Sequence, residues 1–416
     1  MTKPKLCAIL VGGGPAPGIN SVIRAATIKL KNEGVRVIGI FDGYEHLMMG
    51  DISQVTDLQI DDVSNIHFEG GSILRTSRAN PVTREGGLKN VLASMEKLGV
   101  DALMTIGGDD TCFTAVRLEK ESGKKIQIIH IPKTIDNDLN LPADIRTFGF
   151  ATARHYGYLI IKNLMNDAKT TKRWYLITAM GRKAGHLALG IGKPSGATLT
   201  IIPEEFPEKQ LSPKKLVDII VGAIIKRRAA GRFHGVAVLA EGLAQLLSQD
   251  ELKKMGHIEL DQFGHIRLSE IDLGGILKHH VKNELHKLGI STTVVDKDIG
   301  YELRSVEPVP FDVEYTQDLG YSAANYLLDG NSGHMASIQE GRFVPIPFDD
   351  MLDSATGKPI IRMVNISTQS YKVAYEYMIR LKKEDFINSE KLQKLAAAAN
   401  LPPDEFRKRF GYLVVL

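Results

Sequence analysis

Residues 5–34 read KLCAILVGGGPAPGINSVIRAATIKLKNEG, and this stretch decides the fold. Residues 6–11 form a continuous apolar run, and from Ile19 onward apolar side chains recur at helical spacing. Four glycines lie between the two patterns. The order predicts a strand, a glycine-rich loop and a helix. A strand that is apolar at every position is typical of a parallel sheet covered on both faces.

The same alternation continues along the chain. Strand-like runs recur at residues 35–43, 101–106, 126–131, 174–180 and 233–242, with helical stretches between them. The length of 416 residues exceeds one typical core. We therefore expect an α/β protein with two Rossmann-like parallel-sheet domains covered by helices, an active site in the cleft between them, an inserted segment and a helical C-terminal extension.

Composition shifts place the predicted boundaries. An N-terminal α/β domain covers 1–150, a second α/β domain covers 151–305, and 306–416 is a C-terminal segment that packs back on both domains. The stretch of about 242–300 reads as an insertion with a hairpin in HIELDQFGHIRL and a basic helix in ILKHHVKNELHKLG. The helical tail from residue 389 has an apolar end that packs against this subunit or another.

Charge and composition exclude several classes of partner. The formal net charge is only +3, and aromatic residues make up 6% of the chain, so we expect no nucleic-acid partner. The basic runs at 226–228 and 278–280 are interpreted as solvated helix faces. No apolar run reaches the roughly 18 residues of a membrane span, so no membrane partner is expected. Cys7 and Cys112 read as buried thiols, which favours a cytoplasmic location.

The glycine-rich loop has two open interpretations. Gly12, Gly13, Gly14 and Gly18 lie between strand and helix, where backbone N–H groups and the helix dipole favour an anion such as a polyphosphate. Glycines in such turns also serve close packing, and the loop matches neither the Walker pattern nor GxGxxG.

A second strand opens into a helix through GGDDT at 107–111. This places two consecutive carboxylates, Asp109 and Asp110, at the helix start. Magnesium or phosphate chemistry is one reading, because Mg²⁺ prefers carboxylate oxygens. A helix N-cap with a first-turn acid is the alternative, although it needs only one aspartate.

The third unit, IQIIHIPKTIDNDLN at 126–140, is the most specific. A buried strand delivers Lys133, Thr134, Asp136 and Asp138 within six residues. In an extended backbone Asp136 and Asp138 would face one pocket, because residues two apart share a side. A nearby magnesium ion, with one carboxylate taking a hydroxyl proton, would relieve their repulsion. The alternative is an Asx-type loop that bonds local amides, which Thr134 and Asn137 would suit.

Together GGGPAPGIN, GGDDT, PKTIDND, AMGR and AEG resemble, in this order and spacing, the phosphofructokinase family, from residue 6 to about residue 315. The resemblance implies phosphoryl transfer to the 1-hydroxyl of fructose 6-phosphate. It makes Asp136 the catalytic base, Asp109 the acid that binds Mg²⁺, Thr134 and Asp138 their neighbours in the sugar site, and Gly13 a phosphate-contacting glycine.

The resemblance also implies the sugar site of the second domain. Met180, Gly181, Arg182 and Glu241 match the sugar-binding positions. Arg173 matches an arginine that in the family reaches across a subunit interface to the sugar 6-phosphate. A homodimer or homotetramer with active sites at the subunit interface is therefore implied.

Four further positions bear on the phosphates. Tyr301 and Arg304, in GYELRSVEP, resemble a substrate motif of the family's diphosphate-dependent branch. Arg78, in TSRAN, falls near a family arginine that steadies the transferring phosphoryl group. Arg75 stands where a small residue is expected.

The prediction of the phosphoryl donor depends on Asp110 and Lys133. In the ATP-dependent branch a glycine usually replaces Asp110, and a carboxylate there would repel a nucleotide's α-phosphate. Lys133 would stabilise the departing phosphate. The resemblance thus implies a reversible, Mg²⁺-dependent transfer from inorganic diphosphate to fructose 6-phosphate, in glycolysis or gluconeogenesis. Donor and Mg²⁺ would bind in 1–150, and sugar phosphate in 151–305.

Two alternatives stay open at this point. One is an ATP-dependent 6-phosphofructokinase that tolerates Asp110. The other is a non-catalytic regulatory subunit of the same fold, although the full set of acidic residues and Arg182 argues against it.

Overall fold

The computed structural model describes residues 2–142, 145–207, 210–248 and 271–414. The chain divides into two compact units, unit 1 with Met1–Ala153 and Tyr301–Arg362, and unit 2 with Arg154–Gly300 and Met363–Leu416. The chain thus leaves unit 1 after residue 153 and returns to it at residue 301. The corresponding boundaries predicted from the sequence are at 150 and 305. The predicted hairpin at 257–268 lies outside the described residues.

Unit 1 contains a seven-stranded sheet in the order β13-β10-β5-β4-β1-β2-β3. The central strands run parallel, and the edge strands β3 and β13 are antiparallel to their neighbours. A separate pair, β11 and β12, is antiparallel. The strands are β1 Leu6–Val11, β2 Arg36–Ile40, β3 Val55–Asp57, β4 Ala102–Gly107, β5 Gln127–Pro132, β10 His334–Met335, β11 Ile338–Gln339, β12 Arg342–Phe343 and β13 Ile346–Pro347.

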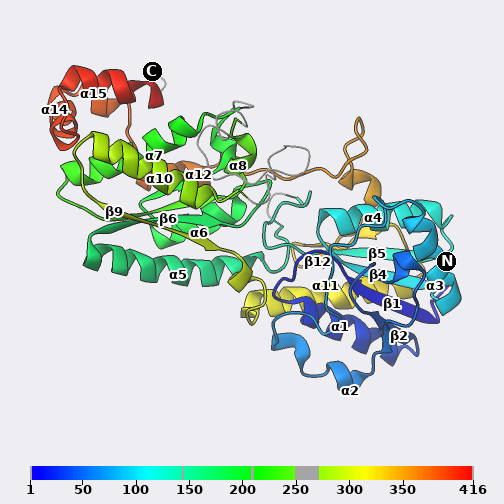
Figure 1. The fold of residues 1–416 in the computed structure, drawn as a ribbon. Coiled ribbons are helices and arrows are strands. Elements are labelled where there is room, and N and C mark those ends of the chain that lie inside the picture. Colours follow the sequence, from blue (N-terminus) through cyan, green and yellow to red (C-terminus); the bar gives the residue numbers. More distant parts are fainter. Residues whose placement is uncertain (1, 143–144, 208–209, 249–270, 415–416) are drawn as a thin grey trace. The chain divides into compact units, whose positions relative to one another are not determined.

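Helices cover both faces of this sheet (Figure 1). Alternate residues of β1 point into two clusters, Cys7 with the residues of α1 and α11, and Ala8 with those of α3 and α4. Both thiols are buried, as predicted. The continuously apolar strand is explained by this double burial. The helices are α1 Ile19–Asn32, α2 Ile60–Val63, α3 Gly87–Leu98, α4 Asp109–Glu121 and α11 Pro310–Leu328.

Unit 2 contains a four-stranded parallel sheet in the order β7-β8-β6-β9. Its strands are β6 Arg173–Ala179, β7 Leu199–Ile201, β8 Gly235–Ala240 and β9 Thr293–Ile299. The predicted insertion at 242–300 includes β9, which pairs with β6 along its full length. This part of the insertion is therefore integral to the sheet. The parallel sheets of both units confirm the predicted α/β class.

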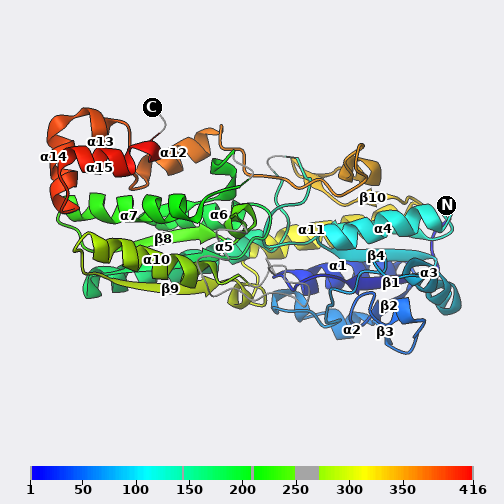
Figure 2. The ribbon, with the colours of Figure 1, turned by 45° about the horizontal axis from the view of Figure 1, so that its top comes forward.

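The helices of unit 2 include most of the C-terminal tail (Figure 2). Phe406 and Phe410 are fully buried in the same cluster as the apolar residues of α7 and α10, so the tail packs within unit 2. The helices are α5 Phe150–Thr171, which begins in unit 1, α6 His186–Ser195, α7 Pro213–Ala229, α8 Leu243–Leu246, α10 Leu273–Lys287, α12 Gln369–Tyr377, α13 Glu384–Ile387, α14 Ser389–Ala398 and α15 Pro403–Phe410.

The interpretation of the basic run at 226–228 as a solvated helix face is wrong. Lys226 donates to the carbonyl oxygen of Arg380 at 2.8 Å and to Asp385 at 2.5 Å. Arg227 donates to the carbonyl oxygen of His234 at 3.0 Å. The side chains of Lys226 and Arg227, at the end of α7, are therefore hydrogen-bonded to neighbouring segments, so this part of the run is not a freely solvated face.

Among the described residues, no helix combines the length and apolarity that crossing a membrane requires.

A buried carboxylate ties α11 to the start of α5 inside unit 1. Asp312 is fully buried and accepts hydrogen bonds from the N–H groups of Gly149 and Thr152, at 3.1 and 2.8 Å, and from the Thr152 hydroxyl at 2.5 Å. Burial raises its pKa, and the bonds from Thr152 and Gly149 oppose this rise. The carboxylate thus satisfies donors that no water reaches.

We expect Asp312→Ala to lower the free energy of unfolding by about 3 kcal/mol, because it leaves buried donors without an acceptor. Urea unfolding followed by circular dichroism measures this. Asp318→Ala is the matched control, since Asp318 lies on the same helix and is exposed. Equal stability of the two variants would show that the Asp312 contacts contribute nothing.

Candidate active site

The glycine loop after β1 is held by its neighbours. The Gly12 N–H donates to the carbonyl oxygen of Ile106 at 2.9 Å, and the Gly13 N–H donates to that of Ser77 at 2.8 Å. The expectation that loop amides face an anion is therefore wrong for these two glycines, because both N–H groups already have acceptors. Gly13 has a φ of 82°, a left-handed conformation that favours glycine.

Lys133 explains why Gly13 lacks a side chain. This lysine follows β5, is only 3% exposed, and donates from its ammonium to the carbonyl oxygen of Gly14. A Cβ atom on Gly13 would lie 3.3 Å from Lys133 Nζ. The loop and the buried ammonium thus occupy adjoining space, and a side chain at position 13 would press on the cation.

The charges around Lys133 are unbalanced. Its pKa is lowered to about 7, chiefly by burial and also by the positive charges of Arg304 and Arg78, while Asp136 and Asp109 oppose the shift. A lysine in this setting holds its proton weakly. An anion placed among these cations would restore the charged form, so the surroundings are suited to an anionic ligand.

Arg304 lies against Gly14 of the glycine loop. A Cβ on Gly14 would come within 3.2 Å of Arg304 Cζ, and this Cζ lies 4.9 Å from the ring centroid of Tyr301. Tyr301 itself is 76% exposed. The sequence predicted both as substrate-binding residues. The structure groups Arg304 with Lys133 and the glycine loop, and Tyr301 supports the guanidinium from outside.

Asp109 and Asp110 open α4, as predicted. Asp109 Oδ1 accepts the N–H of Asp110 at 3.0 Å. Gly107 has a packing role, because a Cβ on it would lie 2.3 Å from the Cβ of Thr111, and a Cβ on Gly12 of the loop after β1 would lie 2.4 Å from Thr111 Oγ1. Both acids thus lie in the first turn of α4 after Gly108 as the N-cap, and the magnesium or phosphate reading stays a prediction.

The Asp109 carboxylate is compatible with a magnesium ion that substrate phosphates and waters also bind. The described residues contain no group of three or more His, Cys, Asp or Glu side chains that could hold a metal alone. Mg²⁺ in phosphate-transferring enzymes is commonly bound through one or two carboxylates together with substrate phosphates and waters. Asp109, whose charge acts on Lys133 beside the glycine loop, provides such a carboxylate.

The segment TIDND is a turn. Asn137 has a φ of 58°, and the N–H of Asp136 donates to Thr134 Oγ1 at 3.0 Å. The expectation of an extended backbone, with Asp136 and Asp138 on one side by strand alternation, is therefore wrong. The local hydrogen bonds of the alternative reading are present, with Asp136 at the apex of the turn.

Arg362 holds this turn and was not found from the sequence. Its guanidinium donates to the carbonyl oxygen of Asn137 at 3.0 Å, to Asn137 Oδ1 at 2.6 Å and to the carbonyl oxygen of Ile145 at 2.6 Å. Its own N–H donates to the carbonyl oxygen of Asp138 at 2.8 Å. Burial lowers the pKa of Arg362, and Asp138 opposes this. No local motif around residue 362 signals the role, because the contact spans much of the chain.

In unit 2 the structure brings together four predicted residues. Met180, Gly181 and Arg182 follow β6, and Glu241 follows the neighbouring β8. The Gly181 N–H donates to Glu241 Oε2 at 3.1 Å, and the Gly242 N–H donates to the carbonyl oxygen of Gly181 at 3.0 Å. Gly181 has a φ of 136°. These residues form one polar group beyond the carboxyl ends of two parallel strands.

Arg173 lies apart from that group. It begins β6, whereas Met180 follows the end of the same strand, a separation of roughly 20 Å at the usual rise per residue. Its nearest carboxylate is Asp167, at 3.9 Å. The structure does not place Arg173 with the other sugar residues of this chain, and its reach into another subunit stays a prediction.

Comparisons with known proteins identify the family of the chain. The family model described as phosphofructokinase matches residues 6–327. The chain is 48% identical to the pyrophosphate–fructose 6-phosphate 1-phosphotransferase of Thermotoga maritima, covering 98% of each chain. It is 46% identical to the protein of that name from Naegleria fowleri, covering 98% of this chain and 95% of the other.

A solved structure shows the same fold. The pyrophosphate-dependent phosphofructokinase of Nitrosospira multiformis superposes with a TM-score of 0.68 at 16% identity, covering 90% of each chain. At this identity the likeness concerns the fold alone. With a family model matched over most of its length and relatives nearly half identical across it, the chain belongs to the phosphofructokinase family.

Proposed function

We propose that this protein transfers a phosphoryl group from inorganic diphosphate to the 1-hydroxyl of fructose 6-phosphate, giving fructose 1,6-bisphosphate and phosphate. The observation that carries the proposal is the buried Lys133 ammonium beside Gly13 and Gly14, with Arg304 next to it. A short polyanion meets the charge requirement of this place. Relatives named for this reaction share almost half of the residues over the full length.

Lys133, Arg304 and Arg78 are proposed to bind the diphosphate. The positive charges of Arg304, which is partly exposed, and of Arg78, which is exposed, act on the buried Lys133, so an anion would relieve this repulsion. Asp110 adds negative charge at the start of α4, which disfavours the extra phosphate and ribose of a nucleotide. Gly13 contributes room for the Lys133 ammonium.

Asp109 is the residue that we propose to hold Mg²⁺. When bound, the ion would neutralise charge on the diphosphate oxygens. The remaining steps are assigned to the side chains of this chain.

Asp136 is proposed as the general base. It accepts the proton of the sugar 1-hydroxyl while that oxygen forms a bond to the terminal phosphorus of diphosphate. The bond from this phosphorus to the bridging oxygen breaks, and phosphate leaves with its charge offset by Lys133. The turn clamped by Arg362 holds Asp136 in position. The products differ little from the reactants in charge, so the transfer is reversible and suits glycolysis or gluconeogenesis.

The sugar phosphate is proposed to bind Met180, Gly181, Arg182 and Glu241 of unit 2, with Thr134 and Asp138 contributing near the base. The Glu241 carboxylate already accepts the Gly181 N–H, which fixes its orientation toward sugar hydroxyls. Arg173, at the far end of β6, is proposed to serve the sugar 6-phosphate of another subunit. A homodimer or homotetramer follows from that role. We also propose a cytoplasmic location, which suits the two buried thiols.

A comparison of two phosphoryl donors tests the assignment of diphosphate. The wild-type protein should form fructose 1,6-bisphosphate rapidly with inorganic diphosphate and slowly with ATP, when initial rates are compared at matched concentrations with Mg²⁺. The double variant Asp110→Gly, Lys133→Gly should shift the ratio of kcat/KM values toward ATP by about 100-fold or more, because it removes the opposing charge and the leaving-group cation.

An unchanged donor ratio in that variant would support an ATP-dependent enzyme that tolerates Asp110. Absence of product with either donor would support the regulatory-subunit alternative. A binding assay with fructose 6-phosphate then distinguishes a folded regulatory protein from an inactive preparation.

An amide at position 136 tests the assignment of Asp136 as the general base. Asp136→Asn should lower kcat with diphosphate by about 1000-fold, since an amide cannot take the proton, while KM for fructose 6-phosphate changes little. Steady-state kinetics measure both constants. A loss of less than about tenfold would mean that another group is the base.

The lysine pKa gives a pH prediction. Because the pKa of Lys133 is lowered to about 7 from 10.5, the ammonium of the free enzyme loses its proton as pH rises through about 7. We expect kcat/KM for diphosphate to fall above that pH, and Lys133→Arg to lack this fall because a guanidinium stays charged. Parallel profiles for the two proteins between about pH 6 and about pH 9 would contradict the assignment.

The lowered pKa of Lys133 also makes the free energy of unfolding depend on pH. Between pH of about 7 and 10.5 the unfolded chain binds a proton at Lys133 that the folded chain does not bind. The contribution of Lys133 to the free energy of unfolding therefore rises with pH across this interval.

A further inference from the structure

Arg75 has a backbone conformation that a side chain disfavours. Its φ is 54°, and Asp42, just after β2, has a φ of 57°. In this left-handed region the Cβ atom crowds the neighbouring carbonyl group, so residues with side chains are uncommon there. Two such residues in contact require interactions that hold the conformation.

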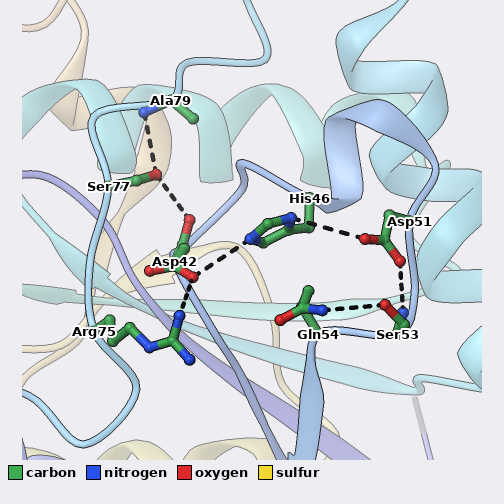
Figure 3. Close-up of polar contacts among 8 residues, drawn as sticks. All are labelled: Asp42, His46, Asp51, Ser53, Gln54, Arg75, Ser77 and Ala79. Carbon is green, nitrogen blue, oxygen red and sulfur yellow. Dashed lines mark hydrogen bonds and ion pairs between the residues drawn. The ribbon is translucent and has the colours of Figure 1, made fainter.

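Their side chains and backbones supply those interactions (Figure 3). Arg75 Nη1 lies 3.0 Å from Asp42 Oδ2, and Arg75 Cζ lies 4.8 Å from the ring centroid of Phe41. The Asp42 N–H donates to the carbonyl oxygen of Leu74 at 3.1 Å. The Ser77 hydroxyl donates to the carbonyl oxygen of Asp42 at 2.7 Å. Asp42 therefore contacts the segment 74–77 through its carboxylate, its N–H and its carbonyl group.

The Asp42 carboxylate is itself held from the other side. His46 Nε2 lies 3.4 Å from Asp42 Oδ2, and His46 Nδ1 lies 3.8 Å from Asp51 Oδ2. The side chain of Asp42 is only 18% exposed, whereas that of Arg75 is 62% exposed. The carboxylate is thus the fixed partner, and Arg75 closes onto it. We call this ion pair the Asp42–Arg75 latch.

The segment that the latch holds lies against the glycine loop. Ser77 pairs with Gly12 in a parallel bridge and accepts the Gly13 N–H at 2.8 Å. The Thr76 hydroxyl donates to the carbonyl oxygen of Gly13 at 2.6 Å. Any displacement of residues 75–77 therefore displaces Gly13, next to which the Lys133 ammonium lies.

We infer that Asp42 and Arg75 are positioning residues for the diphosphate site. The latch stabilises the left-handed backbone at residue 75, and this backbone places Ser77 and Thr76 so that they fix the loop at Gly13. Arg78, three residues after Arg75, is set by the same segment. The inference rests on the proposed function, because it assigns the latch to the donor side of that reaction.

Glycine and alanine substitutions separate this role from direct binding. Arg75→Ala removes the ion pair and keeps a Cβ in the left-handed region, whereas Arg75→Gly removes the ion pair and also the backbone conflict. If Arg75 positions the loop, KM for diphosphate should rise about tenfold in Arg75→Ala and less than about threefold in Arg75→Gly. The KM for fructose 6-phosphate should stay unchanged in both.

Arg36→Ala is the matched control. Arg36 makes an exposed ion pair with Asp57 across β2 and β3, at 2.7 Å, and it begins β2, at the opposite end of this strand from Asp42. It should leave both KM values unchanged. Asp42→Ala should resemble Arg75→Ala, and the double variant should be no worse than either single variant, since both remove the same interaction.

Hydrogen exchange tests positioning without turnover. Peptides that contain the Gly13 amide should exchange about tenfold faster in Arg75→Ala than in wild type or Arg36→Ala, because the bond to Ser77 opens more often. Equal exchange in all three proteins would overturn the latch. Equal KM increases in Arg75→Ala and Arg75→Gly would also overturn it, in favour of direct contact between Arg75 and diphosphate. A wild-type protein that does not use diphosphate would refute the proposed function, and the exchange rates would still decide whether the latch holds the loop.

Discussion

The candidate site depends on a buried cation. Lys133 is almost completely removed from solvent, and this burial is the main reason why the pKa of its ammonium is lowered to about 7. A side chain at position 13 would crowd the ammonium, since its Cβ would lie 3.3 Å from Lys133 Nζ. Arg304 adds a second positive charge, which Asp136 and Asp109 oppose, and an anion bound beside the two cations would stabilise both charges. The fold of unit 1 thus buries an ammonium whose charged form a small polyphosphate would stabilise.

Each unit gathers a group of candidate site residues at the carboxyl ends of its parallel strands. In unit 1, β1, β4 and β5 end in the glycine loop, the start of α4 and the lysine with its aspartate turn. In unit 2, β6 and β8 end in the Met-Gly-Arg turn and Glu241. Parallel strands bring residues distant in the chain to one edge, and their buried backbones make that edge rigid. The reacting groups can therefore lie on short loops without losing their geometry.

The sequence was sufficient for elements whose every residue is buried, and insufficient where position depends on distant contacts. The runs around β1, β4 and β5 were recognised because both faces are covered, whereas β9 was placed in an insertion because it is an edge strand that carries Asp296, Lys297 and Asp298. The TIDND turn was expected to be extended, since no pattern reveals that Asn137 adopts a positive φ. The clamp by Arg362 had no local signal at all. Site residues were thus identified by type, but not the contacts that orient them.

The return of the chain to unit 1 has a consequence for its biosynthesis. The sheet of unit 1 includes β10 and β13, and its core includes α11, all supplied by residues that follow the whole of segment 154–300. A ribosome releases the amino terminus first, and domains generally fold in that order. Here the nascent amino-terminal half lacks a covering helix, two strands and the arginine that clamps its aspartate turn until residue 362 has emerged. The emerging chain therefore exposes an unfinished apolar sheet for most of translation, a period in which protection by chaperones has most to offer.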